Sequence, residues 1–410
     1  MASNIRKNTI WNAAGNIVYL GAQWVVTVMV TRLFGFADAG VLSLAMSISA
    51  SFQTVALFGI RNFQVSDIEN KYSDSCYVSF RCITCAASLI MCALFACVNG
   101  YSADAVVTIM LFMIFRLAEN FSDVLHGIFQ KHDMLYKAGQ SLMMKGCALL
   151  AGFGAGYLAF RNLNGSMASM TLAAVLVTVL FDILQSRKIS EYGFTSRISV
   201  CLSLARETIP LCVYLFLNSV IATAPKYILE KMCDEATLGA YSSIFAPALL
   251  IQAAATYIYM PFLTRFAELY QGRDIKGFRS LAVKVTAVIA AMGAAVLLAA
   301  AFAGKWGLTI LFGEDIVPYS GLLTLIIVGT FCTAVNAFFQ MLAVVIREFR
   351  GLVISCAAGV VICCAASYGA IGVWQADGAS IGLIAGTVSG TLIILVVLIK
   401  RLGRIGGKKE

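Results

Sequence analysis

A row of charged and amide residues interrupts an apolar stretch of the chain around residue 120. It comprises Arg116, Glu119, Asn120, Asp123, His126 and Gln130. At about 100° per residue, this spacing places them within roughly 120° on one face of a helix. A charged side chain inside a membrane usually faces a wet cavity or an opposite charge. Either this face lines a cavity, or Arg116, Glu119 and Asp123 neutralise one another and lock the helix against its neighbours.

Milder polar features occur in two other apolar stretches. One stretch carries Asn12, Asn16, Tyr19, Gln23 and Thr27 on a face about 80° wide, with Arg32 near its end. These amides either line the same cavity or form hydrogen bonds between helices. Lys145 lies about a turn and a half into another stretch. It either binds a ligand or extends its amine to the membrane surface.

A row of small residues favours packing rather than binding. The last apolar stretch carries Gly378, Gly382, Gly386 and Gly390. A glycine at every fourth position lets a second helix backbone approach closely. We therefore expect this row to be a helix contact.

All these rows lie in segments that are expected to cross a membrane. Of the 410 residues, 60% are hydrophobic and only 12% are charged. A helix needs about 20 apolar residues to cross a hydrocarbon core of about 30 Å, and lipid cannot bond to an unpaired backbone. Twelve such windows lie near residues 10–32, 39–60, 77–98, 105–128, 140–160, 164–184, 208–228, 238–261, 282–303, 319–346, 351–373 and 376–400. The sequence thus predicts an all-α polytopic membrane protein of about twelve helices.

The longest connection without an apolar window falls between the sixth and seventh helices. It divides the chain into an N-terminal lobe at 1–188, a cytoplasmic linker at 189–207 and a C-terminal lobe at 208–410 that ends in a short basic tail. Six plus six helices is the layout of transporters built from parallel repeats. We expect two six-helix lobes around a central cavity.

The basic residues predict the orientation. With the N-terminus inside, most of the 30 lysines and arginines, Arg61 and Arg81 among them, fall in cytoplasmic segments. Both termini are therefore expected in the cytoplasm. The formal charge of +9 reflects this bias and does not indicate nucleic-acid binding.

The sequence contains no motif for a cofactor or a metal. A P-loop, a dinucleotide fingerprint, an HExxH motif and a nucleophile elbow are all missing. Most of the 13 cysteines lie in apolar windows, where Cys acts as a small hydrophobic residue. We expect no cofactor, no metal and no ATP-driven activity.

Four segments carry a family resemblance. They are Asn8, Trp11, Asn12, Gly15 and Asn16 near the start, T-R-L-F-G at Thr31–Gly35, G-I-R-N-F-Q-V-S-D at Gly59–Asp67, and R-L-A-E-N-F-S-D-V-L-H-G-I-F-Q at Arg116–Gln130. Together they resemble the Wzx-type polysaccharide flippases of the multidrug/oligosaccharidyl-lipid/polysaccharide exporter superfamily. The likeness is clearest over the first 140 residues.

The resemblance implies a flippase of the bacterial inner membrane. Such proteins move a polyprenyl-pyrophosphate-linked oligosaccharide from the cytoplasmic to the outer leaflet, for O-antigen, capsule or exopolysaccharide synthesis. It also implies alternating access, membrane lipids as surroundings, coupling to H⁺ or Na⁺ or to the membrane potential, and association with polysaccharide polymerase machinery. We expect a monomer.

A lipid-linked sugar pyrophosphate needs hydrogen-bonding groups for its sugars and cations for its phosphates. The substrate-binding candidates are Asn16, Gln23, Arg32, Arg116, Asn120 and Lys145. Arg32 and Arg116 carry the resemblance to the family's cationic positions, whereas Lys145 follows from its burial in an apolar stretch. Glu119 and Asp123 are the ion-coupling candidates.

Two other functions remain open. An ion-coupled exporter of drugs or other cations in the same superfamily would share the fold, and paired acids without excess arginine would favour it. A membrane polymerase or ligase would act on the same lipid-linked sugars. Such enzymes tend to carry a large outer loop, and the outer loops expected here are short.

Overall fold

The computed structural model describes residues 2–67, 71–194 and 198–406, which are helical with short connections and contain no strand. Twelve helices in these ranges are long and apolar enough to cross a membrane. Each of them overlaps one of the twelve predicted windows. The predicted fold class is therefore confirmed.

The chain divides into two compact units, Met1–Phe216 and Leu217–Glu410. The helices of the first unit are α1 (Ala2–Phe34), α2 (Phe36–Leu57), α3 (Ile60–Ser66), α4 (Asp74–Val98), α5 (Ala103–Lys131), α6 (Leu135–Phe160), α7 (Leu163–Val177) with a π-helical continuation (Thr178–Ile183), and α8 (Leu184–Arg187). The boundary between the units lies within α9 (Ile198–Met232). This helix begins inside the segment that was predicted as a linker.

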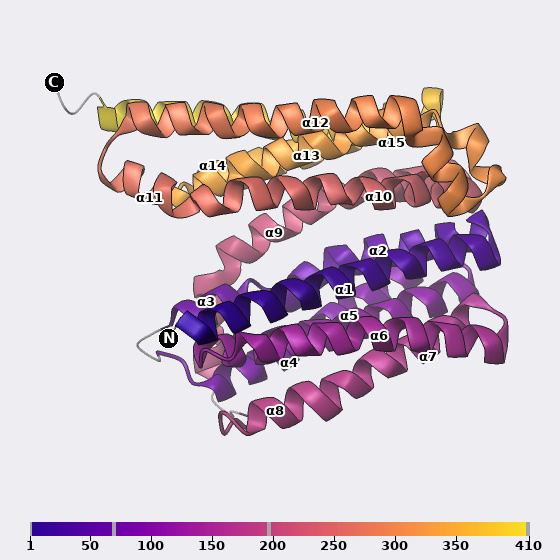
Figure 1. Ribbon diagram of the computed structural model, residues 1–410, viewed down its shortest axis with the longest axis horizontal. Coiled ribbons are helices and arrows are strands. Elements are labelled where there is room, and N and C mark those ends of the chain that lie inside the picture. Colours follow the sequence, from indigo (N-terminus) through magenta and orange to yellow (C-terminus); the bar gives the residue numbers. More distant parts are fainter. Residues whose placement is uncertain (1, 68–70, 195–197, 407–410) are drawn as a thin grey trace. The chain divides into compact units, whose positions relative to one another are not determined.

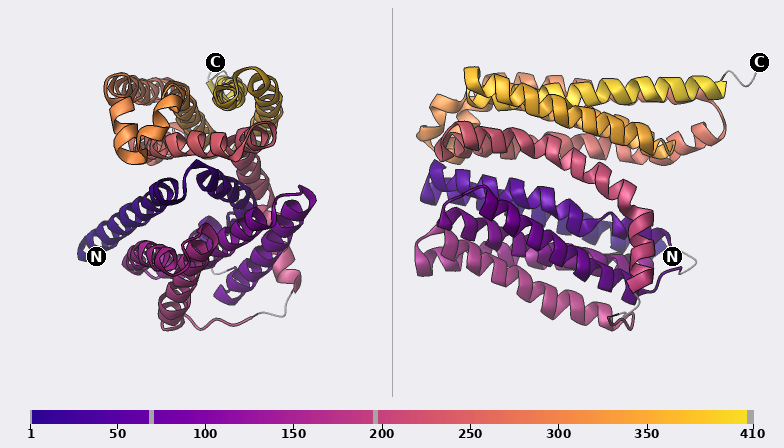
Figure 2. Two further views of the ribbon diagram at one scale, coloured as in Figure 1. Left: turned by 90° about the vertical axis from the view of Figure 1, so that its right-hand side faces the viewer. Right: turned by 180° about the vertical axis from the view of Figure 1, so that it is seen from behind.

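The second unit continues with α10 (Glu235–Tyr259), a 3₁₀ turn (Met260–Phe262), α11 (Leu263–Gln271), α12 (Ile275–Phe312), a 3₁₀ turn (Glu314–Tyr319), α13 (Leu322–Val345), α14 (Phe349–Trp374) and α15 (Ala376–Gly406). In this unit α15 packs along α13 and α14, and α13 also contacts α10 and α12. Figure 2 shows α15, in yellow, alongside its neighbours.

Capping residues and glycines set where the spans begin and end. Ser102 accepts a hydrogen bond from the backbone of Ala105 at the start of α5, and Asn162 does the same for Gly165 at the start of α7. Gly35 and Gly59 turn the chain at the two ends of α2 with φ of 88° and 68°, values that favour glycine. These local signals fix the register of the helices around the site.

In the first unit α5 occupies a central position. It contacts α2, α4 and α7, while α1 packs along α6 and α6 along α7 (Figure 1). Gly15 of α1 and Gly139 of α6 approach so closely that a Cβ on either would overlap backbone of the other helix. The polar faces of α1 and α5 meet at Gln23, which forms hydrogen bonds with Arg116 and Glu119.

Candidate functional site

The first unit contains a polar cavity of about 420 Å³. Residues from α1, α2, α3, α5 and α6 line it. Among them are the sequence-predicted residues Asn16, Gln23, Arg116, Glu119, Asn120, Asp123 and Lys145. Arg32 does not line this cavity and is exposed near the C-terminal end of α1. The structure thus gathers all but one of the predicted site residues at one place, while their roles stay predictions.

Arg116 of α5 is held by its own helix and by α1. Its guanidinium donates to Glu119 Oε2 at 2.6 Å and to Gln23 Oε1 at 3.4 Å, and Gln23 Nε2 donates to Glu119 Oε1 at 3.3 Å. The guanidinium also lies 5.0 Å from the ring centre of Phe112 and 5.5 Å from that of Phe115. The face lines the cavity, and the expected mutual neutralisation holds only for Arg116 and Glu119, because Asp123 pairs with arginines of other helices.

Lys145 of α6 lies in a buried charge network. Its ammonium donates to Asp182 Oδ2 at 2.8 Å and to the hydroxyl of Ser122, and Asp182 Oδ1 lies 3.3 Å from His126 Nε2. The side chains of Lys145 and Asp182 are 2% and 0% exposed. The idea that Lys145 extends to the membrane surface is wrong, because a carboxylate inside the protein holds its amine.

The π-helical turn of Thr178–Ile183 carries Asp182. One such turn adds a residue to the helical repeat and rotates the following side chains, and π turns occur often at functional sites. Sequence reasoning missed Asp182, although a single acid in the apolar run around it was a signal.

Asp123 of α5 binds two arginines. Arg61 of α3 donates to Oδ1 at 3.1 Å, and Arg81 of α4 donates to Oδ2 at 2.9 Å and to the carbonyl of Ala56 at 2.5 Å. Arg81 is 0% exposed. The sequence had counted Arg81 among the basic residues on the cytoplasmic side, and the structure shows that it is not a loop residue, because it lies in α4 and its charge is paired with Asp123.

Several buried donors beside the cavity have no hydrogen-bond partner within the described part of the chain. They are Tyr19 Oη, Arg116 Nε and Asn120 Nδ2. Buried polar groups are nearly always bonded, so each of these donors lacks an acceptor that a ligand or water oxygen would supply. All three atoms are closed off in this structure, so a ligand oxygen reaches them only when the side chains around them move.

Positive charge exceeds negative charge around the cavity. Arg61, Arg116 and Lys145 line it together with Glu119 and Asp123. Directly behind them, Arg81 contacts Asp123 and Asp182 contacts Lys145. Four cations thus face three carboxylates, which favours an anionic ligand.

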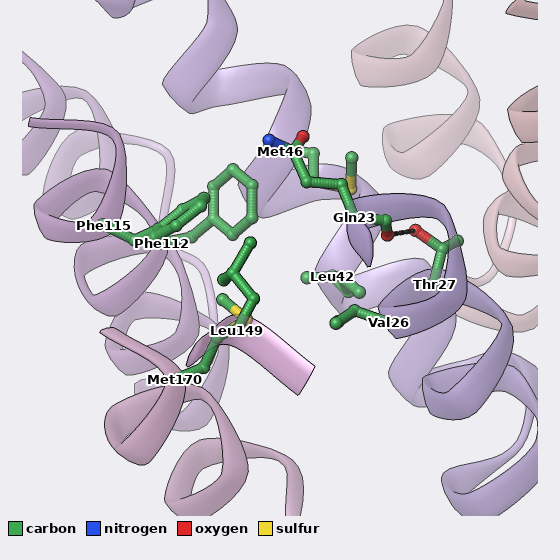
Figure 3. Close-up of a pocket in the computed structure, with 9 residues that line it drawn as sticks. All are labelled: Gln23, Val26, Thr27, Leu42, Met46, Phe112, Phe115, Leu149 and Met170. Atoms are coloured by element: carbon green, nitrogen blue, oxygen red, sulfur yellow. Dashed lines mark hydrogen bonds between the residues drawn. The ribbon is translucent and has the colours of Figure 1, made fainter. Parts of the chain in front are cut away.

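Beyond Gln23 the lining becomes apolar. Gln23 also borders a cavity of about 20 Å³ lined by Val26, Thr27, Leu42, Met46, Phe112, Phe115, Leu149 and Met170. In Figure 3 the two phenylalanines of α5 face Leu149 of α6, and the hydroxyl of Thr27 bonds the carbonyl of Gln23 at 3.2 Å. The charged lining therefore stops at Gln23, and Gln23 and Thr27 are the only polar residues among those that line this smaller cavity.

This fold is shared by transporters of known structure. The chain superposes on an inward-facing multidrug resistance MATE transporter of the MOP superfamily with a TM-score of 0.67 and 13% identity, covering 98% of this chain and 96% of that one. With the lipid II flippase MurJ in an inward closed conformation, the TM-score is 0.72 at 12% identity, covering 97% and 89%. With the Vibrio cholerae MATE transporter VcmN in the bent form, it is 0.62 at 11% identity, covering 98% of both chains. The fold is that of the MOP-superfamily transporters.

Sequence comparison narrows this class to a family. Residues 5–267 match the family described as polysaccharide biosynthesis protein. The chain is also 26% identical over 314 residues to the capsular polysaccharide biosynthesis protein CapF of Staphylococcus aureus, covering 75% of this chain and 78% of that protein. This chain belongs to the polysaccharide biosynthesis protein family, and the predicted resemblance is confirmed.

Proposed function

We propose that this protein moves a polyprenyl-pyrophosphate-linked oligosaccharide from the cytoplasmic to the outer leaflet of a bacterial inner membrane, for the synthesis of a surface polysaccharide. Family membership and the likeness to CapF support the link to polysaccharide synthesis. The shared fold with MurJ, a lipid II flippase, supports a lipid-linked cargo. Both termini lie in the cytoplasm in this proposal, as the distribution of basic residues favours.

The observation that carries the proposal is the donor-rich, net positive cavity of the first unit. Phosphate and sugar oxygens are acceptors, and they match the unpartnered donors of Tyr19, Arg116 and Asn120. An exported drug cation would instead meet an excess of arginine and lysine. The cavity therefore favours the flippase over the cation exporter.

We assign separate parts of the cavity to the two parts of the substrate. Arg61, Arg116 and Lys145 contact the pyrophosphate, because guanidinium and ammonium groups bind phosphate oxygens strongly. Asn16, Gln23 and Asn120 bind sugar hydroxyls. Arg32 lies outside this cavity and would meet the substrate elsewhere on its path.

Glu119 is the better of the two proposed coupling acids. Both oxygens of Asp123 are occupied by arginines. Glu119 instead bonds Arg116 and Gln23, so a proton on Glu119 would remove the counter-charge of Arg116. Protonation of Glu119 would then free the guanidinium of Arg116 to bind a phosphate of the substrate.

The experiment is a translocation assay in proteoliposomes. A fluorescent polyprenyl-pyrophosphate disaccharide is placed in one leaflet, and its appearance in the other is followed with an impermeant quencher. We expect flipping by the wild-type protein, and at least about a tenfold loss in Arg116→Ala, because a charge-assisted hydrogen bond contributes about 1.5–3 kcal/mol.

Arg161→Ala is the matched control, because Arg161 is an exposed arginine that does not line the cavity. It should flip the substrate like the wild type. If the wild-type protein flipped the substrate no faster than protein-free vesicles do, the proposed function would be overturned.

A further inference from the structure

An apolar groove of about 610 Å³ lies in the second unit between α12, α13 and α15. Its α12 wall consists largely of small residues, including Ala282, Ala287 and Ala290, whereas α15 contributes Leu398 and Leu402. Small side chains on one helix opposite leucines on the other leave a trough. In Figure 1 α12 and α15 lie along each other with opposite chain directions, and the two helices contact each other.

The length of the groove matches one leaflet of a membrane. Its lining on α12 runs from Phe278 to Ala290, and at about 1.5 Å per residue this is about 18 Å. Half of a hydrocarbon core is about 15 Å. An acyl chain of a phospholipid fits this length, whereas a long polyprenyl chain exceeds it.

One end of the groove carries a net positive charge. Arg279 lines the groove, Lys276 precedes it by one helical turn, and both are exposed. Neither forms an ion pair with a carboxylate in the described ranges. Of the nearby acids, Glu268 pairs with Arg265 at 3.0 Å, whereas Asp274 caps the backbone of Gly277 at 2.8 Å and keeps its own charge, so two cations stand beside one unpaired carboxylate.

The short helix α11 keeps this end of the unit in place. Phe266 of α11 is fully buried, with its ring centre 5.1 Å from that of Phe278 in α12 and 6.0 Å from that of Phe338 in α13. The apolar face of α11 therefore packs against α12 and α13 and does not face lipid. The start of α12 is held by this contact, with Lys276 and Arg279 exposed beside the groove.

We propose that this groove binds one anionic phospholipid, with an acyl chain between α12 and α15 and its phosphate on Lys276 and Arg279. Basic residues beside an apolar groove at the cytoplasmic end of membrane helices suit an anionic headgroup. A zwitterionic lipid brings an ammonium that opposes the same cations. With both termini in the cytoplasm, as proposed above, this lipid lies in the cytoplasmic leaflet. The proposed site does not depend on which substrate the protein transports.

The test is native mass spectrometry of the purified full-length protein. It is titrated with dioleoyl phosphatidylglycerol, dioleoyl phosphatidylcholine or undecaprenyl phosphate. We expect phosphatidylglycerol to bind most tightly. Removing both cations in Lys276→Gln/Arg279→Gln should weaken it by about fivefold for each charge.

A second variant tests the groove without changing charge. Ala287→Phe/Ala290→Phe fills the trough and should abolish binding of phosphatidylglycerol, whereas Ala299→Phe, at another exposed alanine of α12 outside the groove, should not. Equal binding of the two phospholipids, or unchanged binding in the filled variant, would show only adventitious lipid and overturn the proposal. Preferential binding of undecaprenyl phosphate that the filled variant abolishes would overturn it too, because the groove would then serve a prenyl chain.

Discussion

At the scale of single residues, the central feature of the cavity is that its cations are held rather than free. Lys145 contacts Asp182 and Ser122, and Arg116 contacts Glu119 and Gln23. Both charges lose their hydration when they are buried, and pairing them in this way offsets part of that penalty. A phosphate must then compete with these partners for the cations, which makes release of the substrate easier.

Stability and transport should separate at the Lys145–Asp182 pair. Lys145→Met alone leaves a buried carboxylate without its cation and should cost about 3–5 kcal/mol of folding free energy. The double variant Lys145→Met/Asp182→Leu removes both charges and should recover most of that loss. Thermal unfolding of the purified variants measures the first effect.

Transport should stay lost in the double variant, because the cavity would lack the ammonium proposed to bind phosphate. The proteoliposome assay measures this, with Lys145→Arg as the variant that keeps the charge. A stable double variant that flips the substrate at the wild-type rate would show that the pair is purely structural.

The sequence identified part of this residue network but not its partners. The polar faces of α5 and α1 could be predicted, because helical spacing alone puts these residues on one side of each helix. The bonds of Arg81 to Asp123 and of Lys145 to Asp182 depend on which helices are neighbours. Periodicity within one helix carries no such information.

At the scale of elements, the connection between α3 and α4 is organised by one carboxylate. Asp67 accepts hydrogen bonds from the backbone of Lys71 at 2.8 Å and of Tyr72 at 3.0 Å, and from the hydroxyl of Tyr77 at 2.9 Å. Next to it, Lys71 and Tyr72 both bond Glu207 of α9, at 2.6 and 2.9 Å. This connection therefore ties the first part of α9 to the first unit.

Asp67 should make stability depend on pH. Burial acts to raise the pKa of this carboxyl, but the hydrogen bonds from Tyr72, Lys71 and Tyr77 outweigh burial and lower the pKa. A lowered folded-state pKa gives stability that is complete above the unfolded value of about 3.9 and is lost as the pH falls through the folded value. Asp67→Asn should therefore be less stable than the wild type at pH 7.

The difference in unfolding temperature between the wild type and Asp67→Asn should shrink below about pH 4. Thermal unfolding from pH 7 to pH 3 measures it. A difference that stays constant over this range would mean that the charge of Asp67 does not contribute.

The glycine row of α15 is a packing surface, as predicted. A Cβ on Gly382 would overlap Ser367, and one on Gly386 would overlap Cys363 and Gly359, all in α14, whereas Gly390 has ordinary contact distances of 3.5 Å or more. Gly386→Val should therefore destabilise the protein by about 1–3 kcal/mol. Gly390→Ala should be neutral or slightly stabilising, because alanine favours the helix.

Thermal unfolding in detergent compares the stability of these two variants with that of the wild type. Equal stability of Gly386→Val and the wild type would contradict close packing of α15 on α14.

The spans themselves were predictable from apolar length, but their irregular parts were not. The windows gave twelve helices because membrane thickness sets their length. The short helices α3 and α11, the π turn of Thr178–Ile183 and the early start of α9 escaped prediction. They result from contacts with neighbouring helices, as the bonds from Lys71 and Tyr72 to Glu207 illustrate.

At the scale of the whole molecule, one unit contains the polar cavity and the other contains an apolar groove with basic residues at one end. The family and the fold are established by comparison. The proposed substrate follows from the polar cavity of the first unit. This proposal requires that the polar faces of α1 and α5 border water rather than lipid.

Cysteine accessibility tests that requirement most directly. Single cysteines at Gln23 and Asn16, which line the cavity and are partly exposed, are compared with one at the fully buried Ile109 in a background without the 13 native cysteines. We predict that a charged, impermeant thiol reagent labels positions 16 and 23 from one side of the membrane and that a polyprenyl-pyrophosphate glycan slows this labelling. Labelling at both positions no faster than at position 109, from either side, would contradict a water-filled cavity and the transport function that is proposed for it.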